Sequence, residues 1–325
     1  MIINVFGPES FGFGCLECVR HKPEFDMSNT TCNQPWVHVF KNSTAFVERD
    51  KMTVRPANTT FHISHTRPNK MTITRSIERG VWLSDNSYNY VHFLNSIVPR
   101  IALLKKADKF DNAIFIVEEN SGYRKDFLED IIGIPHNQIV VLMENMVFEC
   151  GEFIITSRPV DLPFGYPSWA INYMRSLFPE ELNNSKRDKK IYVSRHDSNR
   201  RRVNNEQEVI TALTEQGFET VWLEGMHVRD QVRLFNQAEI IVTPHGAALG
   251  NLLWCEAGTK IVEIFNDAYI NAMYYALARR MQLDYRVMFD VNPIFAIPGE
   301  DRIPFEIAQS LNIDVNVPEL LEKIK

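Results

Sequence analysis

The spacing of hydrophobic residues changes near residue 88. Before that point, short runs in which hydrophobic and polar residues alternate, such as 36–40 and 71–74, predict short strands joined by turns. After it, hydrophobic side chains recur at helical spacing across residues 91–104, which predicts a helix. We therefore expect a strand-rich segment over residues 1–80, with helices beginning after it.

Strand-like and helix-like segments then alternate through the rest of the first half. Hydrophobic runs at residues 113–117, 139–142 and 153–155 predict strands, and residues 124–132 predict a helix that ends at Gly133. This alternation is typical of a parallel sheet with helices on its faces.

The alternation restarts after a break. Residues 161–190 combine a loop containing Pro and Gly, a helix at 169–177 and a polar, charged stretch, which indicates a domain boundary. The later strands are predicted at 190–194, 220–223 and 240–242, and the later helices at 206–216, 228–237 and 318–325. We expect one domain of residues 1–170 and another of residues 171–325, with the final helix able to pack back on the first.

A turn of small residues around His245 follows the strand-like run at 238–242. A helix-like run at 252–254 comes next, and then a strand at 260–265 that carries Glu263. In a parallel sheet, such a turn lets a ligand approach the backbone, and the next helix N-terminus favours anions. His245 can donate to a phosphate or a sugar hydroxyl, and Glu263 can accept from a ribose diol. A plain turn is the alternative.

Arginines cluster after another predicted strand end. Residues 194–206 contain Arg195, Arg200, Arg201 and Arg202. Guanidinium groups make bidentate contacts with phosphate and stay charged at all relevant pH values. A position between a strand end and a helix start favours phosphate binding over the alternative, a solvated basic loop.

A third polar cluster opens the first predicted helix, at residues 89–100. His92, Asn95 and Ser96 are expected to share one face, about one turn apart. Such a face suits groups that hold an acceptor hydroxyl or take its proton. The alternative is a capped helix start with a satisfied histidine.

Composition limits the classes of function. Of the 325 residues, 45% are hydrophobic and 23% charged, so the chain can build a globular core without metals or disulfides. A net charge of −6 argues against a general affinity for nucleic acid. No hydrophobic run approaches the roughly 20 residues needed to span a bilayer, and residues 1–6 lack signal-peptide features. The expected location is the cytoplasm, unless a membrane segment has been trimmed from the chain.

The chain has five cysteines, and an odd number argues against a complete disulfide framework. Cys15, Cys18, His21 and Cys32 could in principle form a zinc knuckle. We favour reduced, partly buried thiols in a strand-rich N-terminal region, and we expect no metal site.

The three polar segments, in this order, resemble glycosyltransferase family 61. The matching motifs are Asn-Tyr-Val-His through Pro-Arg at 89–100, Ser-Arg through Asn-Asn-Glu at 194–206, and Pro-His-Gly-Ala at 244–247 on to Val-Glu-Ile at 262–264. The family includes plant xylan-decorating transferases, animal O-linked N-acetylglucosamine transferases of the secretory pathway, and many bacterial and viral polysaccharide enzymes. The resemblance covers about residues 85–265.

The resemblance implies a GT-B fold, in which two Rossmann-like α/β domains face each other across a cleft. The first domain is then the acceptor side and the second binds the nucleotide sugar. It also implies a UDP-sugar donor, inversion at the anomeric carbon and no essential metal.

Roles for individual residues follow from the same resemblance. The residues implied to bind the donor are Arg195, Arg201, Arg202, His245, Gly246, Ala247, Asn251 and Glu263. Those implied on the acceptor side are Tyr90, His92, Asn95, Ser96 and Arg100. Within the donor set, the arginines are implied to contact the diphosphate, the His-Gly-Ala turn to cradle the donor, and the carboxylate to accept from the ribose.

Two positions depart from the family pattern. Ser96 stands where members often carry an Asp, four residues after His92, and Ala248 stands where Gly is common. The first change removes an obvious carboxylate base, which leaves His92 or Asp85 to take the acceptor proton.

The expected function is metal-independent, inverting transfer of a sugar from a UDP-sugar to a hydroxyl of a glycan or glycoconjugate. Xylose and N-acetylglucosamine are the donors best represented among relatives, and xylose is the first choice. We expect no cofactor, no nucleic-acid partner and no membrane span. One alternative, which Ser96 supports, is a non-catalytic protein that binds a nucleotide sugar or glycan. Another is a nucleotide-sugar epimerase.

Overall fold

The structure is a computed structural model of the 325-residue chain. It describes residues 2–4, 9–11, 30–32, 36–48, 51–56, 75–84, 89–142, 146–160, 166–183, 186–291 and 303–325. The chain forms two compact units. The first comprises Met1–Ser10, Thr31–Asp161 and Pro167–Leu177, and the second comprises Phe11–Thr30, Leu162–Tyr166 and Phe178–Lys325.

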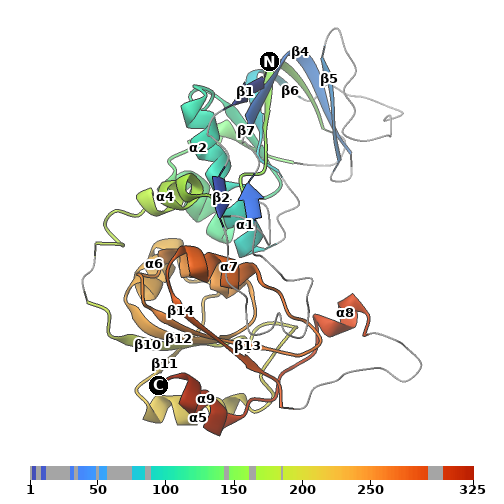
Figure 1. Ribbon diagram of the computed structural model, residues 1–325. Coiled ribbons are helices and arrows are strands. Elements are labelled where there is room, and N and C mark those ends of the chain that lie inside the picture. Colours follow the sequence, from blue (N-terminus) through green and yellow to red (C-terminus); the bar gives the residue numbers. More distant parts are fainter. Residues whose placement is uncertain are drawn as a thin grey trace. The chain divides into compact units, whose positions relative to one another are not determined.

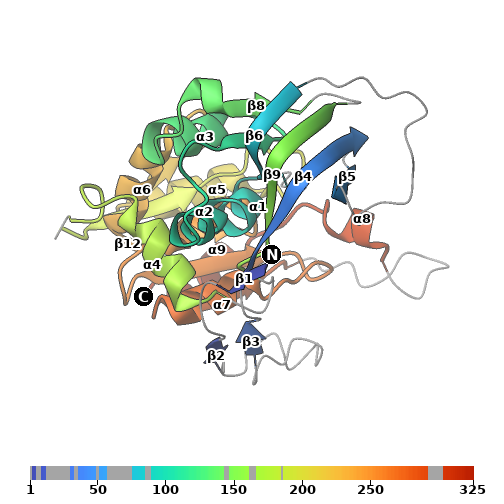
Figure 2. The same ribbon diagram turned by 90° about the horizontal axis from the view of Figure 1, so that it is seen from above.

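In the described residues of the first unit, seven strands form one mixed sheet. Their spatial order is β1 (Ile2–Asn4), β4 (Trp36–Glu48), β9 (Val147–Thr156), β6 (Arg75–Trp82), β7 (Ile114–Val117) and β8 (Ile139–Val141), with β5 (Lys51–Pro56) paired to β4. Strands β9, β6, β7 and β8 are parallel, whereas β4 is antiparallel to its neighbours. Figure 2 shows how antiparallel strands of the N-terminal region extend the expected parallel sheet.

The helical segments of the first unit lie between or after the parallel strands of this sheet. They are α1 (Tyr90–Ser96), α2 (Val98–Lys106), α3 (Gly122–Lys125), the π-helical turn η3 (Asp126–Ile131), the 3-10 turn η4 (His136–Gln138) and α4 (Ser168–Ser176). The single helix expected over residues 91–104 is divided at Ile97, because Pro99 has no N–H to donate to the preceding turn. The Asn89 side chain caps α1 by accepting from the backbone N–H of His92 at 3.1 Å.

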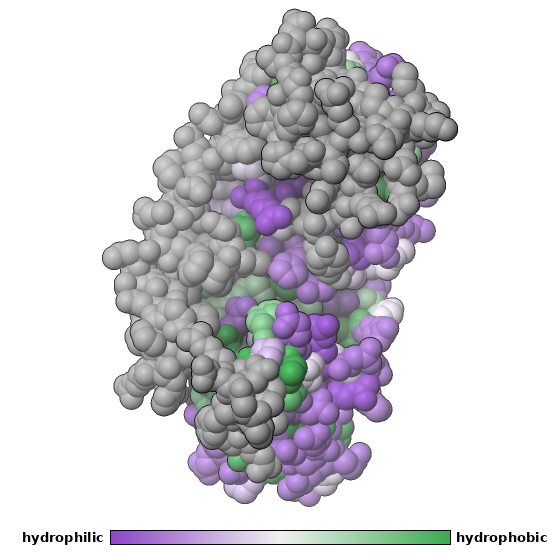
Figure 3. Space-filling model, turned by 90° about the vertical axis from the view of Figure 1, so that its right-hand side faces the viewer, coloured by the Kyte–Doolittle hydropathy of each residue, from purple (hydrophilic) through white to green (hydrophobic). Residues whose placement is uncertain are grey.

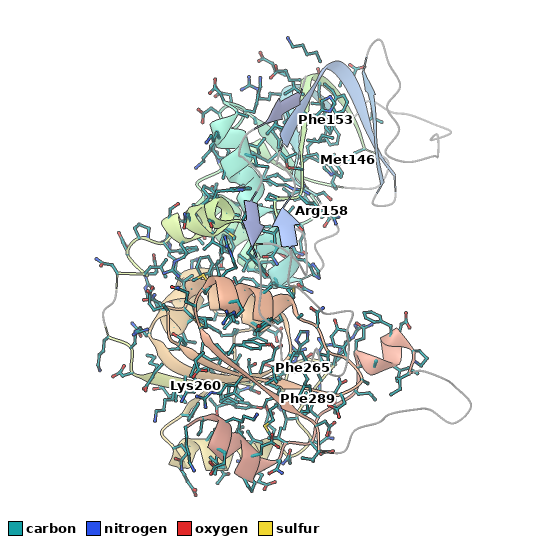
Figure 4. All side chains as sticks on the ribbon, in the orientation of Figure 1. Met146, Phe153, Arg158, Lys260, Phe265 and Phe289 are labelled. Atoms are coloured by element: carbon teal, nitrogen blue, oxygen red, sulfur yellow. The ribbon has the colours of Figure 1, made fainter. Side chains whose placement is uncertain are left out.

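Buried side chains from β9 and its neighbours form the core of the first unit. Phe153 is fully buried, and Met146 belongs to the same cluster (Figure 4). Cys150 also lies in this cluster, and burial raises the pKa of its thiol to about 12, so the thiol stays protonated. The cysteines at positions 15 and 18 lie outside the described residues, as does His21. The strand β3 (Thr30–Cys32) pairs with β2 (Glu9–Phe11).

The second unit contains a five-stranded parallel sheet among its described residues. Its spatial order is β11 (Glu219–Val221), β10 (Lys189–Val193), β12 (Ala238–Pro244), β13 (Lys260–Phe265) and β14 (Asp284–Phe289). The chain moves from β10 to one edge and from β12 towards the other. Strand order therefore reverses between β10 and β12, which is where open parallel sheets bind ligands.

Helices cover both faces of this second sheet. They are α5 (Glu206–Glu215), α6 (Val228–Asn236), the 3-10 helix η5 (Ala247–Trp254), α7 (Met273–Arg280), α8 (Phe305–Ala308) and α9 (Val317–Lys323). Figure 1 shows α6 and α7 on one face, and α5 and α9 on the other. Leu320 and Ile324 share a hydrophobic cluster with Leu213 of α5. The final helix thus packs on α5 of its own unit.

The described surface is mainly hydrophilic on the side that Figure 3 shows, with hydrophobic residues in small patches. The exposed large hydrophobic side chains are Val141, Trp222, Val291, Phe305 and Ile307. Within the described ranges, no helix combines the length and the apolar character that crossing a membrane requires.

Replacing Phe153 by Ala should destabilise the first unit. The Phe153 side chain is fully buried, and truncating a buried Phe lowers the free energy of unfolding by about 3–5 kcal/mol. Urea denaturation followed by circular dichroism measures the change. Val141→Ala is the control, because Val141 is 43% exposed, and it should cost less than about 0.5 kcal/mol. Equal effects of the two substitutions would contradict the burial of Phe153.

Candidate functional site

The turns after β10 and β12 lie side by side at the carboxyl edge of the second sheet. The two strands pair in parallel, and the Thr243 hydroxyl donates to the Val193 carbonyl at 3.1 Å. The first turn leads into the arginine segment, and the second contains His245 and Gly246. Both turns therefore flank the reversal of strand order, the expected position for an anionic ligand.

His245 forms a buried hydrogen-bonded chain with Glu263 and Tyr285. Its Nδ1 lies 2.5 Å from Oε1 of Glu263, and the Tyr285 hydroxyl donates to Oε2 of the same carboxylate. The side chains of His245 and Glu263 are 5% and 0% exposed. A ribose diol that binds Glu263, as the family resemblance implies, has to reach a carboxylate that the protein encloses.

Aromatic rings enclose the imidazole of His245. Phe265 stacks on it with ring centroids 5.0 Å apart, and the rings of Tyr269 and Tyr274 lie at 5.4 and 5.2 Å. Phe265 in turn stacks on Phe289 of β14, with centroids 6.2 Å apart (Figure 4). Close packing of this kind leaves the imidazole little freedom to rotate.

Arg195 packs its guanidinium directly against the backbone of Gly246. A Cβ atom added at Gly246 would lie 1.7 Å from Nη1 of Arg195, well inside van der Waals contact. The backbone of Gly246 has φ 176° and ψ 176°, an extended conformation that any residue adopts. Glycine is therefore needed at this position for space and not for conformation.

Arg195 is a partly buried cation that is held by neutral partners. Its Nη2 donates to the Ser198 hydroxyl at 2.8 Å and to the Arg200 carbonyl at 3.2 Å. Its Nε is buried and has no hydrogen-bond partner among the described residues. Burial, and then the nearby charge of Arg201, lower the pKa of Arg195 to about 10. The folded state thus keeps this charge at a cost that a bound anion would offset.

Arg201 is hydrogen-bonded to the turn that carries His245. Its Nε donates to the His245 carbonyl at 3.0 Å, its Nη1 donates to the Gln309 carbonyl at 2.5 Å, and its guanidinium lies 5.2 Å from the ring centroid of Tyr269. Arg201 has φ 54°, in the left-handed region that residues with a Cβ atom rarely adopt. Burial lowers the pKa of Arg201 as well. Two desolvated guanidinium groups therefore meet at one turn.

Two predicted donor residues direct their side chains elsewhere. Arg202 is exposed, and its Nε donates to the Ser198 carbonyl. Asn251 is fully buried, where its Nδ2 donates to Gln231 and its Oδ1 accepts from the Trp254 indole, both at 3.0 Å. The amide of Asn251 thus fixes η5 to its neighbours.

Ala247 begins η5 immediately after Gly246, so its backbone belongs to the same turn as His245. Of the predicted donor set, the structure brings together Arg195, Arg201, His245, Gly246, Ala247 and Glu263. In the described part of the second unit, no three His, Cys, Asp or Glu side chains converge at metal-ligand spacing. The positive charge that lies against this turn is that of the two guanidinium groups.

The predicted acceptor-side residues begin on α1 of the first unit. His92 is exposed, whereas Asn95 is 3% exposed, so the two side chains differ in their access to solvent. Tyr90 is buried, with its ring 5.3 Å from that of Tyr123, and Ser96 is partly buried. Of this cluster, His92 is the exposed member.

The carboxyl edge of the first sheet holds a carboxylate that the sequence analysis missed. Glu118 follows β7 and accepts from the hydroxyl of Ser84, which follows β6. Arg100 is buried, and its Nη1 donates to the Ser84 carbonyl at 3.3 Å. A carboxylate directly after a buried hydrophobic run is a signal that points to Glu118. Asp85, the second predicted base, lies outside the described residues.

Inorganic pyrophosphate should stabilise the folded protein. An anion held between Arg195 and Arg201 offsets part of the cost of keeping two charged groups desolvated. At constant ionic strength, we expect the melting temperature to rise by about 5 °C or more once pyrophosphate exceeds its Kd about 100-fold. Differential scanning fluorimetry measures the rise.

Three variants control that experiment. Arg195→Ala and Gly246→Ala should abolish the rise, the second because the added methyl group displaces the guanidinium. Arg187→Ala should retain it, since Arg187 is exposed and donates to the Ala257 carbonyl. An undiminished rise in Arg195→Ala would mean that pyrophosphate binds elsewhere.

The sequence profile of Glycosyltransferase 61 matches residues 90–262. The match covers more than half of the 325 residues and runs from α1 into β13, so it includes both turns at the carboxyl edge of the second sheet. No curated protein matches the chain. The extent of the profile match shows that the chain belongs to glycosyltransferase family 61.

Proposed function

We propose that this glycosyltransferase moves a sugar from a UDP-sugar to a hydroxyl of a glycan or glycoconjugate, with inversion at the anomeric carbon and without a metal ion. The proposal includes a GT-B arrangement, in which the second unit binds the donor and the first provides the acceptor side. Membership of the family supports the sugar-transfer reaction itself.

One observation carries the proposal for the donor. Arg195 and Arg201 are desolvated, their pKa values are lowered, and both contact the turn formed by His245 and Gly246. Within the described residues, neither guanidinium forms a salt bridge with a carboxylate. A site that brings two cations together in this way is suited to a ligand with several negative charges, such as a diphosphate.

The same groups suit the departure of the nucleotide. As the bond between the anomeric carbon and the diphosphate breaks, negative charge grows on the departing oxygen, and fixed positive groups lower the barrier. Arg201 is held by two carbonyls and Arg195 by Gly246 and Ser198, so both charges are in place before the reaction. This preorganisation supports a reaction that needs no divalent cation.

The acceptor requires a base. In a single displacement, the acceptor oxygen attacks the anomeric carbon from the face opposite the diphosphate, its proton passes to the base, and UDP leaves. His92 is our first choice, because it is exposed at the start of α1 and the Asn89 cap fixes its backbone. Asp85 is the second choice. For the sugar, we propose xylose first and N-acetylglucosamine second, since these donors are best represented in the family.

Binding and slow hydrolysis of a panel of UDP-, GDP- and CMP-sugars, with EDTA present, tests the donor proposal. We expect one UDP-sugar to bind and to be hydrolysed. Arg195→Ala should weaken its binding at least about tenfold, because a charge-assisted contact is lost. Arg187→Ala is the matched control and should bind normally.

The other outcomes of the panel are distinct. Binding without turnover, even when glycan acceptors are added, would favour a non-catalytic binding protein, which Ser96 supports. Conversion of the donor into another nucleotide sugar without acceptor would indicate an epimerase. If no nucleotide sugar in the panel binds or is hydrolysed, the proposal of a nucleotide-sugar donor is contradicted.

His92→Ala should spare donor binding and reduce transfer. A general base contributes about 100-fold or more to turnover, so we expect a loss of that size with Kd for the donor unchanged within about twofold. His136→Ala is the matched control, because the His136 side chain is 82% exposed and pairs with Glu129 at 2.9 Å. Normal turnover of His92→Ala would remove His92 from the reaction and leave Asp85 as the base.

A further inference from the structure

Glu263 is fully buried, and both of its carboxylate oxygens are hydrogen-bonded within the protein. Oε1 lies 2.5 Å from Nδ1 of His245, and Oε2 accepts the hydroxyl of Tyr285. In the parallel register of β13 and β14, Glu263 lies beside Val287, and Tyr285 is its diagonal neighbour. The carboxylate is thus enclosed between the turn after β12 and a side chain of β14.

With Glu263 ionised, the chemistry of these groups fixes the direction of the hydrogen bonds. A carboxylate only accepts, and a fully buried one needs donors to offset its desolvation. The Tyr285 hydroxyl supplies one donor, so Nδ1 of His245 supplies the other and carries a proton. The opposite edge of the imidazole then presents Nε2.

The backbone of His245 is fixed as firmly as its ring. Its N–H donates to the Ile264 carbonyl at 2.8 Å, and its carbonyl accepts from Arg201. Phe265, Tyr269 and Tyr274 hold the plane of the imidazole. Within that plane, the hydrogen bond at Nδ1 determines that Nδ1, and not Nε2, lies next to Glu263. Glu263 is the group that makes this bond.

We propose that Glu263 is a positioning residue, which holds His245 with a proton on Nδ1 so that Nε2 is directed to the diphosphate of the nucleotide. Tyr285 in turn holds Glu263. This inference rests on the proposed function, because the ligand is the UDP part of the donor. When the imidazole is doubly protonated, Nε2–H donates to a phosphate oxygen, and the Glu263 carboxylate compensates the imidazolium charge.

Matched nucleotides separate this role from direct ribose binding. Isothermal titration calorimetry gives Kd for UDP and for 2′,3′-dideoxyuridine diphosphate, with the wild-type protein and Glu263→Gln. Gln keeps the size of the side chain but removes its charge and one acceptor. We expect the Kd values of both ligands to rise by the same factor, about tenfold, because the substitution acts through His245. A loss confined to UDP would show that Glu263 binds the ribose, and it would overturn the proposal.

A double-mutant cycle tests the path through His245. In the His245→Ala background, Glu263→Gln should weaken UDP no further. Tyr285→Phe should raise the Kd values of both nucleotides by the same factor, which is smaller than that of Glu263→Gln. Tyr275→Phe is its matched control, since the Tyr275 ring packs 5.7 Å from that of Tyr285 while other partners occupy the oxygens of Glu263. Additive losses in the His245→Ala/Glu263→Gln protein would overturn the proposal.

Imidazole nitrogen chemical shifts give a readout that needs no nucleotide. The signals of His245 are identified by their disappearance in His245→Gln. We expect a protonated Nδ1 in the wild-type protein, and a gain of the Nε2-protonated tautomer in Glu263→Gln, because the Gln amide can also donate. An unprotonated Nδ1 in the wild-type protein would overturn the proposal. If no nucleotide binds at all, the proposed function fails, and these shifts still decide whether Glu263 orients His245.

Discussion

The reversal of strand order between β10 and β12 determines where the groups of this site lie. The chain leaves β10 towards one edge of the sheet and leaves β12 towards the other, so the two turns diverge from neighbouring strand ends. The hydrogen bond from Thr243 to the Val193 carbonyl ties the two strands together just before they diverge. Arg195 follows the first strand and His245 the second, so the sheet brings these two residues to neighbouring turns.

Two cations, Arg195 and Arg201, lie against the turn of His245 and Gly246, and keeping both charged without a ligand costs free energy. Burial lowers the pKa of Arg195 and of Arg201, and the charge of Arg201 lowers the pKa of Arg195 further. Residue 246 is a glycine, and the guanidinium of Arg195 occupies the space that a Cβ atom would fill. The position of Arg195 therefore depends on Gly246, because the glycine lets the guanidinium approach the turn at which the diphosphate is proposed to bind.

The sequence predicted the parts of this site that have local signals, and missed those that depend on register. Hydrophobic runs predicted β10, β12 and β13, and Arg195 and His245 were found because they directly follow strand ends. No pattern predicted α7 or β14, so Tyr274 and Tyr285 were missed, since the ring contact of Tyr274 with His245 and the hydrogen bond of Tyr285 to Glu263 depend on how these elements pack. Likewise, helical spacing placed His92 and Asn95 on one face, whereas the structure exposes the first and buries the second.

Glu263 shows why an acid in a motif does not reveal its role by spacing alone. From sequence, an acid one strand after His245 fits a ribose acceptor and an internal partner equally well. In the register of the sheet, Glu263 pairs with Thr243 and does not follow the end of its strand. Helices cover both faces of a central parallel strand, so a carboxylate there is shielded from water and needs protein donors. His245 and Tyr285 are those donors. A carboxylate that binds a ligand is better placed beyond the strand end, as Arg195 and His245 are.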